Sequence, residues 1–449
     1  MVSLTFPSLI CLRAARLFLA SLLCALVLSP GATATAAPPG AVSLESVLRD
    51  VAASNPTLAA RRSMAEAASD RRRSAGAWES PMIEVGVVNL PTSGRFDEDE
   101  MTMKMVGVSQ RVPLFGAKGL RRRAAGEEAN AAGAASARAQ FDLYGEAVAA
   151  YADAYYALES VGEAIRHESG IRRFAEAARA RYRAGNGRLE EILRAEAEGA
   201  RVRADVVRFQ SDAEVALARL DALRAQDAQG APPTLAAPPS FVVPADPASW
   251  IAAATEGHPR VREAEARARS YGFSARADRR AVWPDLEVRA SYGQRGRDAM
   301  GMELDDMVSA TVAFTLPIFS GSREGAMANE MDAMARVASA ERAEASLDLT
   351  REARTLHAEA TAASRMVALL ADTVVVTQSK ALEASWSAFT AGTTDLYRVL
   401  DLSHALYAED LELLEARRTL ARAQGALIAL TGRGDLAGVD LPAIGRDGR

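Results

Sequence analysis

The sequence comprises 449 residues, with 53 Lys and Arg against 58 Asp and Glu, which gives a formal net charge of −5 at pH 7. A chain with this acidic balance is a poor partner for nucleic acid, and we expect no nucleic-acid ligand. Its only cysteines, Cys11 and Cys24, fall within the first 36 residues, so the remaining sequence excludes disulfides and thiolate metal sites.

Residues 1–36 are typical of a secretory signal peptide. Two arginines precede an apolar run, Leu17–Leu28, and small residues follow it, so cleavage is expected near Ala34 or Ala36. The run is about 12 residues long, shorter than the roughly 20 that a membrane-spanning helix needs. A lipoprotein anchored at Cys24 is an alternative, but Leu23 is larger than the small residue that lipoprotein cleavage requires.

The rest of the chain contains two similar halves. The landmarks recur in the same order at offsets of about 203 to 207 residues: Asn55-Pro56 with His258-Pro259, Val112–Phe115 with Leu316–Phe319, and Ala184-Gly185 with Ala391-Gly392. A fixed offset between similar segments indicates a duplicated architecture. We therefore expect a first structural repeat at 37–240 and a second at 241–449, which includes a C-terminal tail.

Each repeat begins with a short helix and a pair of strands. Leu286, Val288 and Ala290 alternate with polar residues, and this period of two predicts a strand with one apolar and one polar face. The same alternation recurs along the chain, so strands are expected at about 82–90, 101–112, 285–293 and 307–316. Polar, turn-like segments separate the two strands of each pair.

A long helical hairpin follows each strand pair, at about 119–228 and 323–431. No proline occurs between Pro113 and Pro232 or between Pro317 and Pro442, which favours uninterrupted helices. The first helix of each hairpin has about 65 to 70 residues and a length near 100 Å. Heptad spacing predicts coiled-coil packing at Phe141, Tyr144, Val148, Tyr151, Tyr155 and Leu158, and again at Val399, Leu406, Leu413, Leu420 and Leu427.

The strands are the segments suited to a membrane. After the signal peptide the sequence has no run of 18 apolar residues, so we expect no transmembrane helix. Strands of about 8 to 11 residues are long enough to cross a bilayer when tilted. Four strands cannot close a barrel, and open edges are unfavourable in hydrocarbon, so several copies of the chain must pool their strands.

The ordered set of features resembles the TolC-type outer-membrane factors of export systems. The resemblance rests on the duplication, on the Asn55-Pro56 segment, on Val108–Gly116 ahead of the first long helix, and on the tip at Gly392–Asp401. It implies a mainly α fold with a small β part. Three subunits would form a trimeric α-barrel from long hairpins and would share a transmembrane β-barrel, with four strands from each.

The same resemblance implies a location and partners. The homotrimer would sit in outer-membrane lipid of a Gram-negative bacterium, with its helical tunnel in the periplasm, and would bind a periplasmic adaptor protein and an inner-membrane pump. No cofactor is expected. The sequence also has no phosphate loop, no G-x-S-x-G and no H-E-x-x-H motif, so the chain is not expected to be an enzyme.

Gln110–Gly119, followed by Leu120-Arg121-Arg122, is most similar to the heavy-metal, CzcC-like branch of this family. That similarity implies a passive exit duct for heavy-metal cations delivered by a pump of the RND type. Multidrug efflux and type I protein secretion use the same fold and are the alternatives. A periplasmic adaptor or a coiled-coil structural protein is a more remote one, because neither explains two hairpins in tandem with strand pairs.

The family's periplasmic gate carries acidic residues after the second glycine tip. Asp401 lies nine residues past Gly392 and is the candidate gate carboxylate. Three copies would form an acidic ring that favours cations. The family's other acidic position is Arg398 here, and Arg398 is expected to pair with Asp401 or with Asp395. The alternative is a solvated aspartate on a polar helix face.

The two hairpin tips resemble the places where the family's adaptor docks. They comprise Gly185, Asn186, Gly187, Gly392, Thr393 and Thr394. Glycine suits such a tip because it adopts the left-handed conformation in which a helix ends. The alternative is a turn without a partner.

Methionines alternate at Met101, Met103 and Met105. Thioether sulfur is a ligand for soft metals such as copper or silver, so these residues are weak candidates for metal contact. The alternative is that they simply cover one face of a strand. The four histidines have no spacing typical of metal ligands.

Overall fold

The structure is a computed structural model that describes residues 41–227, 232–298, 300–314, 318 and 320–433. The expected signal peptide, residues 315 and 316 at the end of the fourth expected strand, and the chain from 434 onward lie outside the described residues. From Val42 onward the chain forms one compact unit, so the two sequence repeats pack together as a single body.

The two repeats have the same order of elements. The first contains α2 (Leu44–Ser54), α3 (Pro56–Ala75), β1 (Met82–Val88), β2 (Met103–Val112), α4 (Ala117–Arg183) and α5 (Leu189–Arg224). The second contains α6 (Ala248–Thr255), α7 (Pro259–Arg280), β3 (Leu286–Arg295), β4 (Met307–Phe314), α8 (Ser320–Leu369), a π-helical turn η1 (Leu370–Val374), α9 (Val375–Thr390) and α10 (Leu396–Thr431). The expected fold class, mainly α with a small β part, is confirmed.

Two helices, and not the single short helix expected, precede each strand pair. In the first repeat the Asn55 side chain accepts hydrogen bonds from the backbone N–H groups of Thr57 and Leu58, at 3.0 and 3.3 Å, and so caps α3. In the second, His258 Nδ1 accepts from the Arg260 N–H at 3.1 Å. Burial lowers the pKa of His258 to about 4, which keeps Nδ1 free to accept. The Asn-Pro and His-Pro landmarks are therefore helix boundaries, with proline in the first turn.

The four strands form one antiparallel sheet in the order β1-β2-β3-β4. The repeats join at its centre, where β2 pairs with β3. Val106 lies opposite Val85 on one side and Tyr292 on the other, and Tyr292 lies opposite Val308. Because side chains alternate between faces, this row and its neighbours give one face that is almost entirely apolar. Among the described residues, no strand pairs with the outer edges of β1 and β4.

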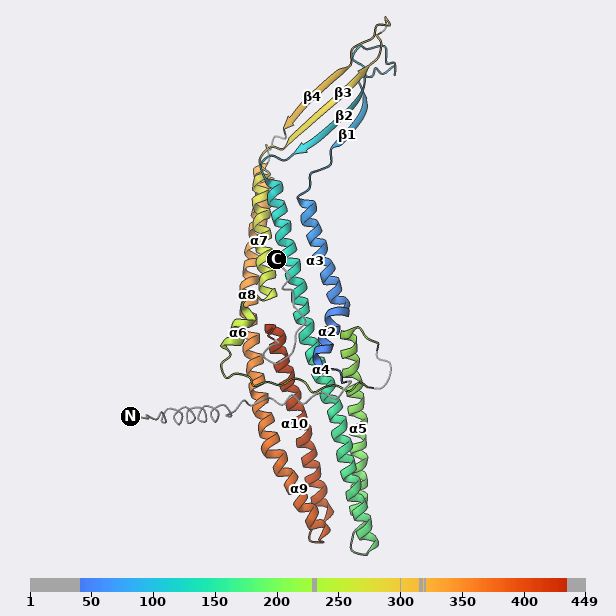
Figure 1. Ribbon diagram of the computed structural model, residues 1–449, viewed down its shortest axis with the longest axis vertical. Helices are drawn as coiled ribbons and strands as arrows, with labels where there is room; N and C mark the ends of the chain where they lie inside the picture. The colour runs from blue at the N-terminus through green and yellow to red at the C-terminus, as the bar shows by residue number, and fades with distance from the viewer. Residues whose placement is uncertain (1–40, 228–231, 299, 315–317, 319, 434–449) are drawn as a thin grey trace, which may run out of the picture. The chain divides into compact units, whose positions relative to one another are not determined.

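The apolar face of the sheet is uncovered. Ile83, Val85 and Val308 expose 72%, 81% and 79% of their surface. The strands lie beyond the ends of α3, α4, α7 and α8, as Figure 1 shows, and no helix of the described part of the chain covers them. A soluble protein rarely leaves such a contiguous apolar surface in water, so the sheet face needs another apolar environment.

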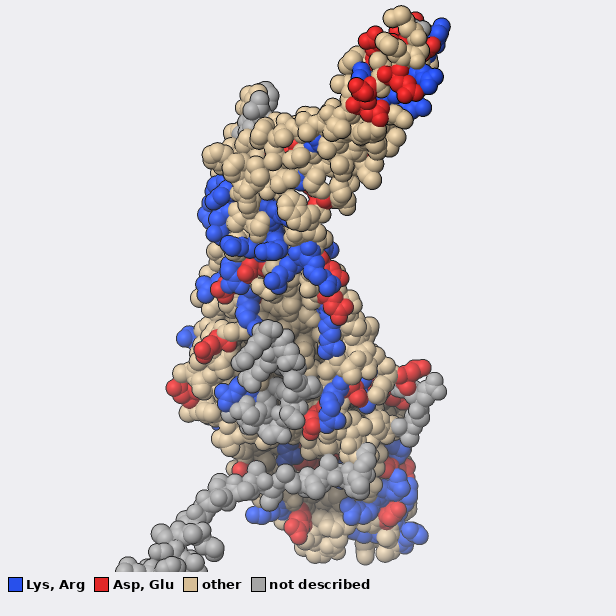
Figure 2. All heavy atoms as spheres, turned by 45° about the horizontal axis from the view of Figure 1, so that its top comes forward, with Lys and Arg blue, Asp and Glu red and all other residues tan. Residues whose placement is uncertain are grey.

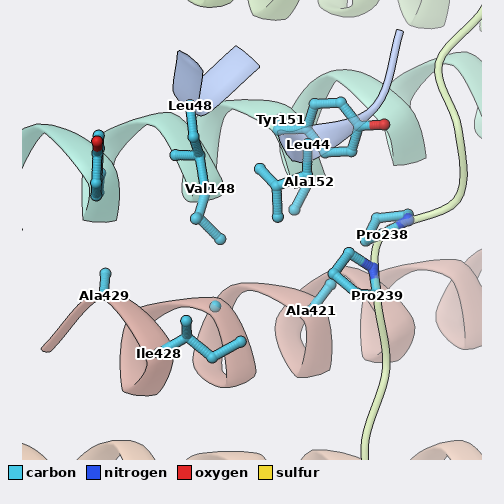
Figure 3. A pocket seen from close by; sticks show the side chains of 12 residues that line it. Leu44, Leu48, Val148, Tyr151, Ala152, Pro238, Pro239, Ala421, Ile428 and Ala429 are labelled. Carbon is cyan, nitrogen blue, oxygen red and sulfur yellow. The ribbon is translucent and has the colours of Figure 1, made fainter. Parts of the chain in front are cut away.

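The core lies where the helices of both repeats meet. Tyr151 of α4 is fully buried, and its hydroxyl donates hydrogen bonds to the backbone, where the oxygens of Val42 and Ala236 lie at 2.9 and 2.6 Å. In the neighbouring seam, Leu48 and Val148 face Ile428 of α10 (Figure 3). The space between them is only about 10 Å³, so this seam is packed and is no ligand site.

The second long helix differs from expectation in two ways. It is interrupted by η1, whereas the lack of proline predicted a continuous helix; a π turn needs neither proline nor glycine, so no breaker marks it. By length and composition alone, Gly321–Thr390 also meets the criteria for a candidate membrane span, which the sequence did not lead us to expect; meeting these criteria does not place the helix in a membrane. The segment is far longer than a bilayer requires, and its α8 part packs against α7 and α10.

Candidate functional site

The two hairpin tips have the same backbone geometry. Gly185 and Gly392 have φ values of 76° and 80°, in the left-handed region. The N–H of Gly185 donates to the Tyr182 oxygen and the N–H of Gly392 to the Phe389 oxygen, both at 3.0 Å. A second hydrogen bond of 2.9 Å joins the next residue of each tip to the helix: the N–H of Asn186 donates to the Arg181 oxygen, and the N–H of Thr393 donates to the Ala388 oxygen. This pair of bonds completes a Schellman-type helix end in both tips. The sequence duplication is thus reproduced in hydrogen-bond detail.

The other tip residues are held locally. A Cβ at Gly187 would lie 2.8 Å from the Tyr182 nitrogen, so only glycine fits there. The Thr393 hydroxyl donates to the Ala388 oxygen at 3.0 Å, and Thr394 is half-buried. Asn186 is exposed, as are Gly185, Gly392 and Thr393. The tips therefore present a fixed backbone shape to solvent, where a partner can reach it.

Two contacts that the sequence did not indicate join the tip regions of the two hairpins. Arg181 Nη1 donates to the Phe389 oxygen at 3.0 Å, and its guanidinium lies 4.5 Å from the centre of the Phe389 ring. The buried Glu191 accepts from the N–H of Leu396, the first residue of α10, at 3.4 Å. Glu191 is the third residue of α5 and also accepts from the Arg188 N–H at 3.4 Å. In the sequence, only the capping-box position of Glu191 at the start of α5 marks this residue. That position does not reveal its contact with α10.

An apolar cluster lies beside these contacts. It contains residues of α4, α5, α9 and α10, namely Ile171, Phe174, Ala175, Ala178, Ile192, Ala195, Val202, Phe389, Leu396, Val399 and Leu400. Burying this many apolar side chains holds the two hairpins together next to their tips. A movement that opens the tips must therefore break this packing as well as the two polar contacts.

The three candidate gate residues lie at the start of α10. Asp395 is its N-cap, with a carboxylate that accepts from the backbone N–H of Arg398 at 3.2 Å. Asp401 and Arg398 are both exposed. Within the described residues no ion pair joins the Arg398 guanidinium to Asp395 or Asp401, so the pairing expected from the sequence is absent in the single subunit. The Asp401 carboxylate points into solvent and not into the core.

Titratable groups gather further along the seam between α4 and α10. Burial and, to a smaller extent, the nearby Glu163 raise the pKa of Asp410 to about 6, against the effect of Arg166 and Arg417. His167 stacks on Tyr407 with ring centres 4.2 Å apart, and burial lowers the pKa of His167. This seam therefore carries a carboxyl group that titrates near neutral pH.

The methionines lie on the polar face of the sheet. Met103 and Met105 alternate with the apolar-face residues of β2, and Met105 and Met307 both pair with Gly293. A Cβ at Gly293 would lie 2.4 Å from the Met103 sulfur, so this glycine leaves room for that side chain. Met101 is exposed and precedes the strand. Among the described residues, no group of three or more His, Cys, Asp or Glu side chains is arranged to hold a metal ion.

Comparison with known proteins agrees with this architecture. Residues 47–226 and 250–433 match the profile of a family described as "Outer membrane efflux protein". The outer membrane efflux protein BepC of Brucella suis is 26% identical over 299 residues, 66% of this chain. That match spans 64% of BepC, less than two thirds of its length.

Two solved structures show the same fold. The open state of the MtrE outer membrane channel of Neisseria gonorrhoeae is 19% identical, with a TM-score of 0.72 over 89% of this chain and 91% of MtrE. The outer-membrane channel OprN is 20% identical, with a TM-score of 0.71 over 88% of this chain and 90% of OprN. Since the family profile covers most of the sequence, the chain belongs to the outer membrane efflux protein family and is, as expected, an outer-membrane protein.

Proposed function

We propose that the chain is one subunit of a trimeric outer-membrane channel that serves as a passive exit duct. The observation that carries this proposal is the four-stranded sheet with an uncovered apolar face and two unpaired edges. Lipid hydrocarbon can cover the apolar face of the sheet. Each edge strand still needs a partner strand, because unpaired backbone N–H and C=O groups are costly in hydrocarbon. Joining β4 of one subunit to β1 of the next satisfies both edges and closes a barrel.

The exposed tips support a role in docking a periplasmic adaptor. Their backbone is fixed by the hydrogen bonds at Gly185 and Gly392, and both turns have the same shape. An adaptor hairpin can therefore bind either of two similar surfaces on each subunit. In this proposal the inner-membrane pump, of the RND type, supplies the energy, and the adaptor shifts the tips between closed and open positions.

The assembly is tested by the mass of the mature protein extracted in mild detergent from separated outer membranes. A trimer is expected, and after reconstitution in a planar bilayer it should conduct ions. A monomer in the soluble periplasmic fraction would contradict the pooled-strand pore. It would favour a periplasmic adaptor or a coiled-coil structural protein instead.

We further propose that the cargo is a heavy-metal cation. Support comes from the sequence similarity of Gln110–Gly119 to the metal branch, and from Met103, Met105 and Met307 on the polar face of the sheet. In a closed barrel with the apolar face outward, that polar face lines the pore. Thioether groups at three symmetric positions would then offer soft, exchangeable contacts to a passing cation.

The cargo is tested by deleting the gene and measuring growth across panels of metal salts and drugs. Selective sensitivity to metals supports the proposal, whereas sensitivity to drugs alone supports multidrug efflux. Replacing Met103 and Met105 with leucine keeps their volume and removes the sulfur. The variant is expected to lose resistance to silver or copper several-fold while keeping the same amount of trimer.

The matched control for that variant is Met327→Leu together with Met334→Leu, both on the exposed surface of α8. These changes are expected to leave metal resistance intact. Unchanged resistance in the Met103 and Met105 variant would show that the sulfurs only cover the strand.

A further inference from the structure

Exposed aromatic side chains mark the junction between the sheet and the helices. Trp78, between α3 and β1, is 63% exposed, and Trp283, between α7 and β3, is 56% exposed. The ring of Phe115, between β2 and α4, lies 5.1 Å from that of Trp283. Aromatic residues flank the apolar band of membrane proteins, where one side is hydrocarbon and the other is wet. These residues therefore give the depth of the membrane boundary on the helical side.

A hollow of about 680 Å³ lies on the helical side of that boundary, with Gly76, two residues before Trp78, among its lining residues. It lies beside the end of α3 and the start of α4 and is lined by four arginines, Arg72, Arg73, Arg122 and Arg123. Ser69 and Asn130 add polar groups, and Glu127 is its single carboxylate. Figure 2 shows how the charged side chains are distributed on one face of the molecule. Few charges lie over the sheet, and Lys and Arg are concentrated on the adjoining ends of the helices.

Most of this positive charge is not neutralised within the subunit. Arg73 pairs with Asp70, and Glu127 is engaged by Arg269 at 2.9 Å. In the part of the chain that the structure describes, Arg72, Arg122 and Arg123 make no ion pair with a carboxylate. Three guanidinium groups therefore face the hollow without an anion.

Each of two arginine side chains lies against a glycine of the other helix. A Cβ at Gly76, at the end of α3, would lie 2.6 Å from Cδ of Arg122, so a larger residue there would require the Arg122 side chain to shift. A Cβ at Gly126 of α4 would lie 3.5 Å from Nε of Arg72, an ordinary van der Waals distance. The side chains of Arg72 and Arg122 therefore lie between α3 and α4.

We propose that this hollow binds the phosphate headgroup of an anionic phospholipid in the periplasmic leaflet of the outer membrane. A guanidinium group can donate two parallel hydrogen bonds to the oxygens of one phosphate. Basic residues just outside the hydrocarbon attract anionic lipid. The order along the chain from exposed apolar strands to exposed aromatics to unpaired arginines is the order of hydrocarbon, interface and headgroup. The inference rests on the outer-membrane location and does not depend on the cargo.

The test is native mass spectrometry of the detergent-solubilised trimer after incubation with equal amounts of phosphatidylglycerol and phosphatidylethanolamine. The wild type is expected to retain phosphatidylglycerol preferentially. Each arginine near a lipid surface contributes roughly a fivefold gain in binding, so R122Q is expected to weaken retention about fivefold. The triple variant R72Q/R122Q/R123Q is expected to show no preference between the two lipids.

The matched control is R173Q/R183Q/R219Q, which removes the same charge from exposed positions far from the junction in sequence. Its lipid preference is expected to equal that of the wild type, and the single-channel conductance of both triple variants is expected to stay unchanged. If the junction triple variant fails to assemble, R72Q and R122Q are measured singly.

Three outcomes would overturn the proposal. The first is equal retention of phosphatidylglycerol by wild type and R122Q. The second is displacement of the lipid by millimolar inorganic phosphate, which would identify a site for free phosphate. The third is a junction variant that loses the trimer while its residual trimer keeps the lipid preference, which would assign the arginines to carboxylates of the neighbouring subunit.

Discussion

Asp401 combines two properties that a gate residue needs. Its carboxylate is exposed, and it lies two turns from the tip on a helix whose opposite face is packed. In a trimer, three such carboxylates repel one another and attract cations in a narrow passage. Asp401→Ala is expected to raise the leak conductance of the isolated channel and to lower its cation selectivity. Single-channel recording measures both.

The control for Asp401 is Glu412→Ala, an exposed carboxylate three turns further along α10. Its conductance is expected to match the wild type. If Asp401→Ala behaves like that control, Asp401 is a solvated surface residue and no part of the gate.

Asp410 predicts a pH dependence of stability. Its pKa in the folded protein is raised to about 6, chiefly by burial, so the folded chain binds this proton more tightly than the unfolded chain does. Lowering the pH from 7 through 6 towards 4 is therefore expected to stabilise the protein through this group. Asp410→Asn should raise the thermal unfolding midpoint at pH 7.5 and reduce the gain seen at pH 5. The exposed Glu412→Gln variant should keep the wild-type difference, and an equal difference in both variants would exclude Asp410 as the source.

At the level of single residues, the sequence predicted backbone conformations better than it predicted contacts between residues. The glycines of both tips were predicted to adopt the left-handed region; Gly185 and Gly392 do so, whereas Gly187 does not. The expected pairing of the Arg398 guanidinium with Asp401 or Asp395 is not seen within the described residues, where the Asp395 carboxylate instead accepts from the backbone N–H of Arg398. The link from Arg181 to Phe389 joins residues 208 apart, and no local pattern contains that information.

Replacing glycine with alanine is expected to have opposite effects on stability at a hairpin tip and inside a long helix. Gly392→Ala places a Cβ at φ 80° and is expected to cost about 1–2 kcal/mol. Gly133→Ala, in the middle of α4 with open space around it, is expected to stabilise by roughly 0.5–1 kcal/mol. Thermal unfolding in detergent should show shifts of opposite sign. Two shifts of the same sign would mean that the tip is not held in the left-handed conformation.

Elements were predictable where one periodicity dominates over a long stretch. The alternation of Leu286, Val288 and Ala290 and the heptads of the long helices gave the right kinds of element in the right order. The second helix before each strand pair was missed because Asn55 and His258 act through capping, a property of one side chain and not of a pattern. The π turn was missed because it leaves the composition of the helix unchanged.

Adjacent positions on β4 test the membrane orientation of the whole molecule. Val308 lies on the apolar face and Ser309 on the polar one. Val308→Lys is expected to cost at most about 2–4 kcal/mol, the value for a lipid-facing lysine at the bilayer midplane, and to reduce the amount of trimer in the outer membrane. Ser309→Lys is expected to assemble normally and to lower cation conductance. Equal assembly of the two variants would contradict an outward-facing apolar surface.

The π turn at Leu370–Val374 makes the two hairpins of one subunit unequal. The helix from sheet to tip has 67 residues in the first repeat, whereas α8, η1 and α9 together have 71 in the second. In the proposed trimer, six hairpins in a ring would look alike if the repeats were identical, but this difference would leave only threefold symmetry. The grooves between neighbouring hairpins would then alternate between two kinds, so an adaptor that favours one kind would bind in three copies and an indifferent one in six.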